Sequence, residues 1–192
     1  MKRNGVAPSL AAAAGVAAAL WFAAMPATAA AMTVAELFGS LKPGQWMALE
    51  GTPQANQTVL CNEAKIMTGD LLEDDWAVRA VVKSLDAQKQ RVNVHHLAIR
   101  MSEDIEYHVL NKFADIKTGM LIDAGGTFMK DGTFLAKDLE DESEKLKRKP
   151  QWQTRIKFTG RVGKVDVTRR RITMMGSDFV LNDQTRVMSI VK

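Results

Sequence analysis

Apolar and polar residues alternate strictly in two short segments of the chain. Residues 91–94 read Arg-Val-Asn-Val, and residues 171–174 read Arg-Ile-Thr-Met. A period of two places successive side chains on opposite faces of a β-strand. Each segment is therefore predicted to be a strand with one buried face.

The two alternating segments belong to longer internal matches. Residues 82–101 match residues 162–181 without a gap, and these are named the A segments. Residues 38–60 match residues 113–135 without a gap, and these are named the B segments. The chain order is B, A, B, A, which predicts two copies of one structural unit.

Polar connections separate the apolar runs at short intervals. Residues 86–90 and 166–170 occupy matching positions and have the composition of hairpin connections. The pattern predicts an all-β fold. One short helix is expected at Val34–Leu41, where Thr33 can cap its first turn.

The order of the segments limits how they can close. An A segment followed by a B segment, residues 76–140, gives about five strands, which suits a small, partly open barrel of the OB type. The first B and the last A cannot each close a sheet alone, because a half-unit leaves unpaired edges. We therefore expect residues 33–66 to complete a second OB-like barrel with residues 155–190. One larger barrel or continuous sheet is the alternative. Residues 141–152 are interpreted as a charged, solvated linker, and a short charged helix is the alternative for this segment.

The N-terminal residues have the order of a secretory signal peptide. The basic pair Lys2-Arg3 precedes an apolar stretch at residues 7–25, and small residues follow at positions 27–29. We expect residues 1–31 to be a leader, cleaved near Ala29 or Ala31, and the protein to be periplasmic or secreted. The apolar stretch approaches the ~20 residues of a membrane-spanning helix, so an uncleaved inner-membrane anchor is the alternative.

Removing the leader changes what the charge implies. The chain has 26 Lys and Arg against 22 Asp and Glu, and two of the basic residues leave with the leader. The remaining balance is close to neutral, so bulk basicity indicates no particular partner. A single cysteine, Cys61, excludes an intramolecular disulfide and is expected to be a small buried residue.

Catalytic motifs are absent from the sequence. The chain has no Gly-x-Ser-x-Gly elbow, no phosphate-binding loop and no His-Glu-x-x-His zinc motif. The sequence therefore predicts a protein that is not an enzyme and that has no cofactor.

A turn and core pattern in the second half of the chain resembles a known family. It runs from Gly160–Asp166 through Ile172-Thr173 to Asp183-Gln184-Thr185, and residues 117–136 form its companion. This pattern resembles the small exported β-barrel repeat domain of unknown function that is common in bacterial envelope proteins. The resemblance implies an OB-like fold and an envelope location, and it carries over no catalytic residues.

These observations together favour a partner-binding β-barrel module for an envelope protein or complex. Large aromatic rings dominate interface energetics, and a basic hairpin would also suit a membrane surface or an acidic glycan. The candidate contact residues are Trp46, Trp76, Trp152, Arg169, Arg170 and Arg171. OB-like barrels often bind nucleic acid, but export argues against that partner.

The alternative function is binding or delivery of a metal, copper or zinc, in the periplasm. Imidazole and thioether groups are ligands that these metals accept. The candidate ligands are His95, His96, His108 and Met101. Adjacent residues of a strand point to opposite faces, so the two neighbouring histidines can share one ion only from a turn.

Overall fold

The computed structural model describes residues 30–72 and 75–191. These residues form one curled sheet of fourteen strands, together with two short α-helices and two 3₁₀ helices. The fold is therefore all-β, as the alternating pattern predicts. Residues 1–29, which contain most of the expected leader, lie outside the described residues.

One end of the sheet is built from the middle of the chain and is named the central half. Its strands are β4 (Trp76–Val81), β5 (Ser84–Asp86), β6 (Arg91–Val94), β7 (Leu97–His108), β8 (Leu121–Phe128) and β9 (Phe134–Asp141). The 3₁₀ helix η1 (Phe113–Asp115) lies between β7 and β8. The spatial order is β4-β8-β9-β7-β6-β5.

The other end is built from both ends of the chain and is named the terminal half. Its elements are β1 (Ala30–Met32), α1 (Val34–Ser40), β2 (Trp46–Pro53), β3 (Val59–Thr68), β10 (Ile156–Arg161), β11 (Lys164–Asp166), β12 (Arg171–Met174), β13 (Ser177–Val180) and β14 (Arg186–Val191). The spatial order is β10-β2-β3-β13-β12-β11, and β14 pairs with β3 and β1. The first B segment and the last A segment therefore lie side by side, and the strand order matches that of the central half.

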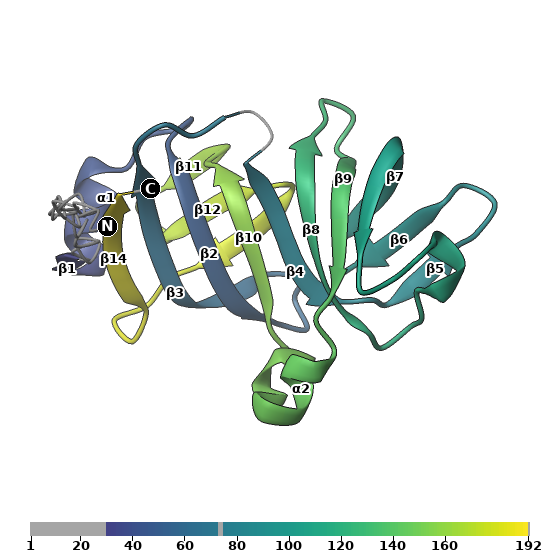
Figure 1. Ribbon diagram of the computed structural model, residues 1–192. Helices are drawn as coiled ribbons and strands as arrows, with labels where there is room; N and C mark the ends of the chain where they lie inside the picture. The colour runs from purple at the N-terminus through teal and green to yellow at the C-terminus, as the bar shows by residue number, and fades with distance from the viewer. Residues whose placement is uncertain (1–29, 73–74, 192) are drawn as a thin grey trace, which may run out of the picture.

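The two halves meet where β10 pairs with β2 on one edge and with β4 on the other (Figure 1). The four segments thus lie in one continuous sheet, which was the alternative arrangement. Phe158 of β10 lies opposite Val78 of β4, and these two residues occupy matching positions in the internal repeat. Matching positions are consequently arranged around a local two-fold axis at this seam.

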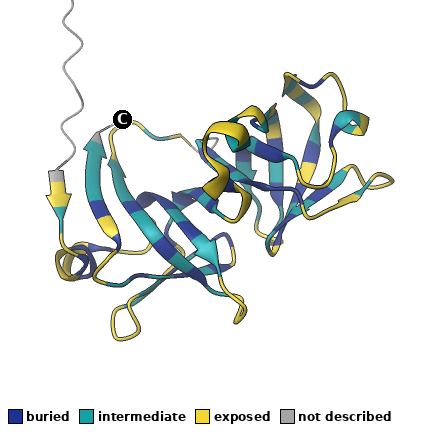
Figure 2. Cartoon of the chain, turned by 90° about the horizontal axis from the view of Figure 1, so that it is seen from below, coloured by how far each residue is buried: buried dark blue, intermediate teal, exposed yellow. Residues whose placement is uncertain are grey.

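Alternating burial along the strands builds the core. In β6 and β12 the residues Val92, Val94, Ile172 and Met174 are all fully buried, which confirms the strand prediction for both segments. Figure 2 shows buried positions alternating with partly exposed ones along the strands, while much of the surface of the turns and helices is exposed. Each half therefore encloses apolar side chains on its inner face.

Both halves contain a β-bulge at a matching glycine. The register shifts at Glu50/Gly51 in β2 and at Gly125/Gly126 in β8. A Cβ atom on Gly51 or on Gly126 would overlap a carbonyl oxygen of the neighbouring strand. Only glycine permits this close approach, which lets the strand bend as the sheet curls.

Helix α1 begins where the sequence predicts. Thr33 accepts a hydrogen bond from the backbone N–H of Glu36, and the Glu36 carboxylate accepts one from the Thr33 N–H, which completes a capping box. Val34, Leu37 and Phe38 are buried, so the helix packs one face against the core.

The charged segment 141–152 is not the solvated linker that the sequence analysis expects. It contains α2 (Glu144–Arg148) and leads into the 3₁₀ helix η2 (Pro150–Gln153). Trp152 packs against Val81 and Leu121, and the buried Glu142 lies 3.5 Å from the Arg79 guanidinium. Although most of its residues are charged, this segment contains the buried indole of Trp152 and the buried carboxylate of Glu142. It therefore packs against the sheet.

The start of the fold also differs from the expectation of residue 33. Strand β1 pairs antiparallel with β14, and Ala31 lies opposite Met188. Cleavage after Ala29 would leave β1 whole, whereas cleavage after Ala31 would remove two of its three residues. Among the described helices, none is long and apolar enough to cross a membrane.

Candidate functional site

The three tryptophans proposed as surface contacts are buried. Trp46 and Trp76 are each 8% exposed and Trp152 is 7% exposed. The rings of Trp46 and Trp76 lie 5.3 Å apart at the seam, and the Arg79 guanidinium lies 5.3 Å from the Trp152 ring. These rings stabilise the sheet from inside, so the structure does not support a role as partner anchors.

The basic hairpin between β11 and β12 carries arginines that already have partners. The ion pairs are Arg169 with Asp166 at 3.3 Å, Arg170 with Asp183 at 2.5 Å and Arg171 with Asp178 at 2.9 Å. Each guanidinium is thus balanced by a carboxylate of the same half. The hairpin presents less free positive charge than its sequence indicates.

The neighbouring histidines lie on the turn that joins β6 to β7. His95 has a φ of 49°, and the ring centroids of His95 and His96 are 4.0 Å apart, so the turn does bring the two rings together.

The other two candidate ligands are elsewhere. Met101 is buried within β7, and His108 ends that strand, about 40 Å of extended chain from the turn. Within residues 30–72 and 75–191 there is no group of three His, Cys, Asp or Glu side chains that could hold a metal ion. The four residues do not form one site.

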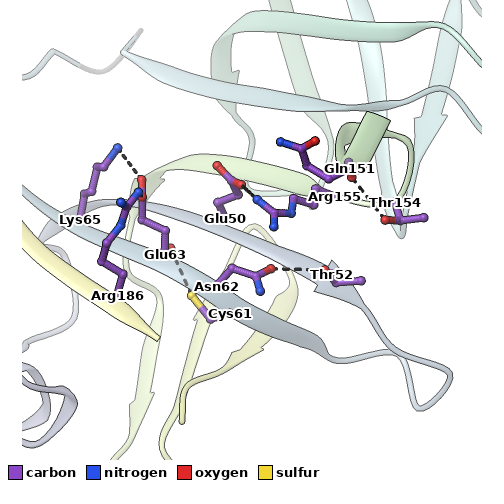
Figure 3. Close-up of polar contacts among 10 residues, drawn as sticks. All are labelled: Glu50, Thr52, Cys61, Asn62, Glu63, Lys65, Gln151, Thr154, Arg155 and Arg186. Atoms are coloured by element: carbon purple, nitrogen blue, oxygen red, sulfur yellow. Dashed lines mark hydrogen bonds and ion pairs between the residues drawn. The ribbon is translucent and has the colours of Figure 1, made fainter. Parts of the chain in front are cut away.

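Cys61 lies in the core of β3 and is 2% exposed. Its thiol donates a hydrogen bond to the carbonyl oxygen of Glu63 at 3.2 Å (Figure 3). Burial, together with the nearby charge of Glu50, raises the pKa of this thiol far above its usual range. A protonated, enclosed thiol is a poor nucleophile and a poor metal ligand.

The polar face of β2 and β3 is also internally paired. Glu50 accepts a hydrogen bond from Arg155 at 2.8 Å, and Glu63 pairs with both Lys65 and Arg186 (Figure 3). Opposite charges therefore neutralise one another across this face. Three cations face two carboxylates here, and each of them is held in an ion pair within the face.

An open groove of about 860 Å³ runs along the outer part of the central half. Its apolar wall is formed by Leu85, Ile105, Tyr107, Phe113 and Ile116. Polar side chains line the remainder, among them Gln90, Glu103, Asn111 and Lys112. Partial burial raises the pKa of Tyr107, so its phenol is neutral at pH 7 and can act as both donor and acceptor.

The strand that borders this groove has an unpaired edge. Residues Glu106–His108 of β7 pair with β9, and no strand of the described chain pairs with their other edge. The corresponding strand of the terminal half is β14. Val187 of β14 pairs with Ala64 of β3, and the repeat-equivalent residues Tyr107 of β7 and Leu139 of β9 pair in the same way. There the second edge is covered by β1.

The residue that ends this open edge has an unfavourable backbone conformation. Val109 has a φ of 71° and is 78% exposed. A β-branched residue in the left-handed region is strained, and such strain gathers at functional sites. An exposed apolar side chain and a strained backbone thus occur together beside the groove.

Carboxylates gather around the same edge. Glu103, Asp104 and Glu106 on β7 are exposed, and β9 places Asp138 beside Glu106 and Glu140 beside His108. The side of the edge that faces solvent is therefore acidic, and the side that faces the groove is mainly apolar, with Glu103 as its carboxylate.

Comparison of the chain with protein-family models, with curated proteins and with solved structures finds no match in any of the three. The sequence analysis missed the groove because its residues are scattered over residues 85–116 with no motif. One signal in the sequence did point to this edge. Turn residues follow Leu181 in the second A segment, but residues 102–108, which follow the matching Met101, contain no such turn, and this indicates that the strand through Met101 continues.

Proposed function

We propose that the protein is a non-enzymatic, partner-binding module of the cell envelope, and that it binds an extended segment of a partner protein along the open edge of β7. The observation that carries the proposal is the contrast between β14, whose edge is covered by β1, and β7, whose matching edge is uncovered. An added strand gains affinity from main-chain hydrogen bonds and specificity from pockets for alternate side chains.

The charge around the edge defines the chemistry of the partner segment. Side chains of an added strand point alternately to the two faces of the sheet. One set would enter the apolar groove beside Ile105 and Tyr107, and the other would face Glu106 and Glu140. A segment that alternates apolar residues with Lys or Arg satisfies both faces.

Export is part of the proposal, and the position of β1 supports it. Ala30 begins β1, so cleavage after Ala29 would release a chain that starts with the covering strand intact. Expression in a bacterium, followed by mass measurement of the protein from the periplasm, tests this. A mass that begins at Ala30 is expected, whereas an uncut chain in the membrane fraction would support the anchored alternative.

The binding site is tested with two synthetic peptides that alternate Val with Lys and Val with Glu. Amide resonances of the purified protein are followed by NMR as each peptide is added. The Lys-containing peptide is expected to shift the resonances of residues 102–109 and 113–116 in a saturable manner. The Glu-containing peptide is expected to leave them unchanged.

Matched variants separate the groove from the rest of the surface. Leu85→Ser removes an exposed part of the groove wall and should weaken binding of the Lys-containing peptide. Val167→Ser changes a more exposed apolar residue on the terminal half and should leave binding unchanged. Shifts that centre on the terminal half, or equal binding of both peptides, would overturn the assignment.

A further inference from the structure

The two-fold arrangement at the seam creates two matching packing sites, and one of them is filled by aromatic rings. The indole of Trp76 covers Gly160 so closely that a Cβ atom there would overlap the ring. The same indole lies 5.3 Å from the ring of Trp46 and 5.8 Å from the ring of Phe128. Met175 completes this side, since its methyl group also approaches Gly160.

The matching site on the other side carries smaller side chains. In the internal repeat, Trp76 is replaced at its matching position by Ile156. Phe128 is replaced by Pro53, and Met175 is replaced by His95. These three smaller residues line a partly open cavity of about 200 Å³, together with Val81, Lys83 and residues 153–155. The space that rings occupy on one side of the seam is thus open on the other.

The polar groups of the cavity are basic or neutral. Lys83 and Arg155 are part of its lining, and the lining contains no carboxylate. The Nη1 atom of Arg155 bonds Glu50, which lies outside the lining. The Nε2 atom of His95 is buried and has no hydrogen-bond partner among the described residues. A buried polar atom without a partner is costly, and a ligand can supply the missing bond.

We propose that this cavity binds a small organic acid, with its carboxylate between Lys83, Arg155 and His95 and its apolar body against Pro53, Val81 and Ile156. A neutral imidazole can place its proton on Nε2 and donate it to a carboxylate oxygen. Charge-assisted bonds from the two cations would hold the same group. The apolar walls favour a branched hydrocarbon body over a purely inorganic anion. This site is separate from the groove of the central half.

Isobutyrate is the probe, and isobutyramide is its neutral counterpart of the same shape. The imidazole resonances of His95 are followed by NMR at pH 7 while each compound is added. A saturable shift with isobutyrate and none with isobutyramide is expected. Lys83→Gln should weaken binding roughly tenfold or more, because one charged hydrogen bond is lost. Lys89→Gln, an exposed lysine of the same hairpin, should leave the affinity unchanged.

A second variant keeps the test decisive if Lys83→Gln perturbs the fold. His95→Met introduces the residue found on the filled side and removes the imidazole reporter, so binding to this variant is followed by the backbone amide resonances of residues 83 and 155. Isobutyrate should leave these resonances unchanged, while the amide spectrum of the rest of the protein is preserved. Equal shifts with isobutyramide would overturn the assignment to an anion. Equal binding of inorganic phosphate would overturn the assignment to an organic acid, and the absence of a saturable shift would overturn the site itself.

Discussion

The terminal half and the central half share one strand order but differ at their outer edge and at the seam. In the terminal half, β1 covers β14 and helix α1 packs its buried face on the core. In the central half, β7 continues directly to residue 108, and only the three-residue helix η1 follows. The same arrangement of strands thus yields one closed half and one half that exposes an edge and a groove.

This contrast arises from the chain segments that flank each B segment. The first B segment is preceded by residues 30–37, which are free to add strand β1 and the first turn of helix α1. The second B segment is preceded by β7, which must first pair with both β6 and β9. Residues that can cover the outer edge are available in the terminal half. In the central half the corresponding residues are already paired in β7, which is why only that half carries the proposed peptide-binding edge.

Truncation of the ring that fills the seam should have the largest effect. Trp76→Ala removes an indole that contacts Trp46, Phe128 and Gly160, and it should lower the free energy of unfolding by about 3–5 kcal/mol. The matched change Ile156→Ala should cost only about 2 kcal/mol, because Ile156 already borders a cavity. Urea denaturation of both variants measures the difference. Equal losses would show that the two sides of the seam are packed alike.

Replacing His95 by the residue found on the filled side should stabilise the protein. His95→Met removes a buried nitrogen without a partner, and it should raise the free energy of unfolding by about 1 kcal/mol at pH 7. The measurement is urea denaturation in the absence of added carboxylates. A lower stability of the variant would show that the imidazole is well satisfied where it lies.

The same variant should also change the dependence of stability on pH. Burial, with the charges of His96 and Lys83, lowers the pKa of His95 from 6.5 to about 4. Between these values the unfolded chain binds a proton that the folded protein does not, so stability falls as the pH falls from 6.5 to 4. His95→Met should weaken this fall, whereas His108→Gln, at an exposed position, should not. Identical pH profiles for all three proteins would contradict the assignment.

The contrast between the halves also shows what could be learned from the sequence. Alternation at residues 91–94 and 171–174 predicts strands because a period of two has one structural solution, and both strands are present. The gapless matches predict that the chain ends meet, and β2 does pair with β10. Strand periodicity does not indicate which strand edges pair with each other. The sequence therefore could not distinguish one continuous sheet from two separate barrels.

The candidate residues were harder to place for physical reasons. An indole ring suits an interface and a core equally, so Trp46, Trp76 and Trp152 could not be assigned to either from the sequence. The small residues at positions 30 and 31 resemble a signal-peptide cleavage region, so the sequence did not indicate that they form β1, the strand that covers β14. The charges of residues 141–152 favour solvent, and they concealed the buried Glu142. In each case the deciding contact is made by residues distant in the sequence.

A smaller effect is expected where the two outer edges end. Val109 is strained in the left-handed region, so Val109→Gly should raise the free energy of unfolding by up to about 1 kcal/mol. The matching residue Ser189 lies in β14 opposite Ala30, so Ser189→Gly should instead lower it by about 0.5–1 kcal/mol. Thermal and urea denaturation of the pair check the signs. A change of the same sign in both variants would show that the two edges end alike.

The smallest effect on stability is expected from exchanging the residues at the tips of the two basic hairpins. Arg170 pairs with Asp183 on the surface, and Gln90 occupies the matching position with Glu103 in place of Asp183. Arg170→Gln should therefore cost less than about 0.5 kcal/mol, a difference that salt should reduce further. A larger cost that persists in high salt would contradict this.

The reverse exchange links the comparison to the proposed function. Gln90 and Glu103 both line the groove of the central half, so Gln90→Arg would place a guanidinium beside the acidic edge. Stability should again change by less than about 0.5 kcal/mol, but binding of the Lys-containing peptide should weaken because the edge loses negative character. Arg170→Gln should leave that binding unchanged. If the two variants bound the peptide equally well, the acidic edge of β7 would have no part in recognition, and the two halves would differ in shape alone.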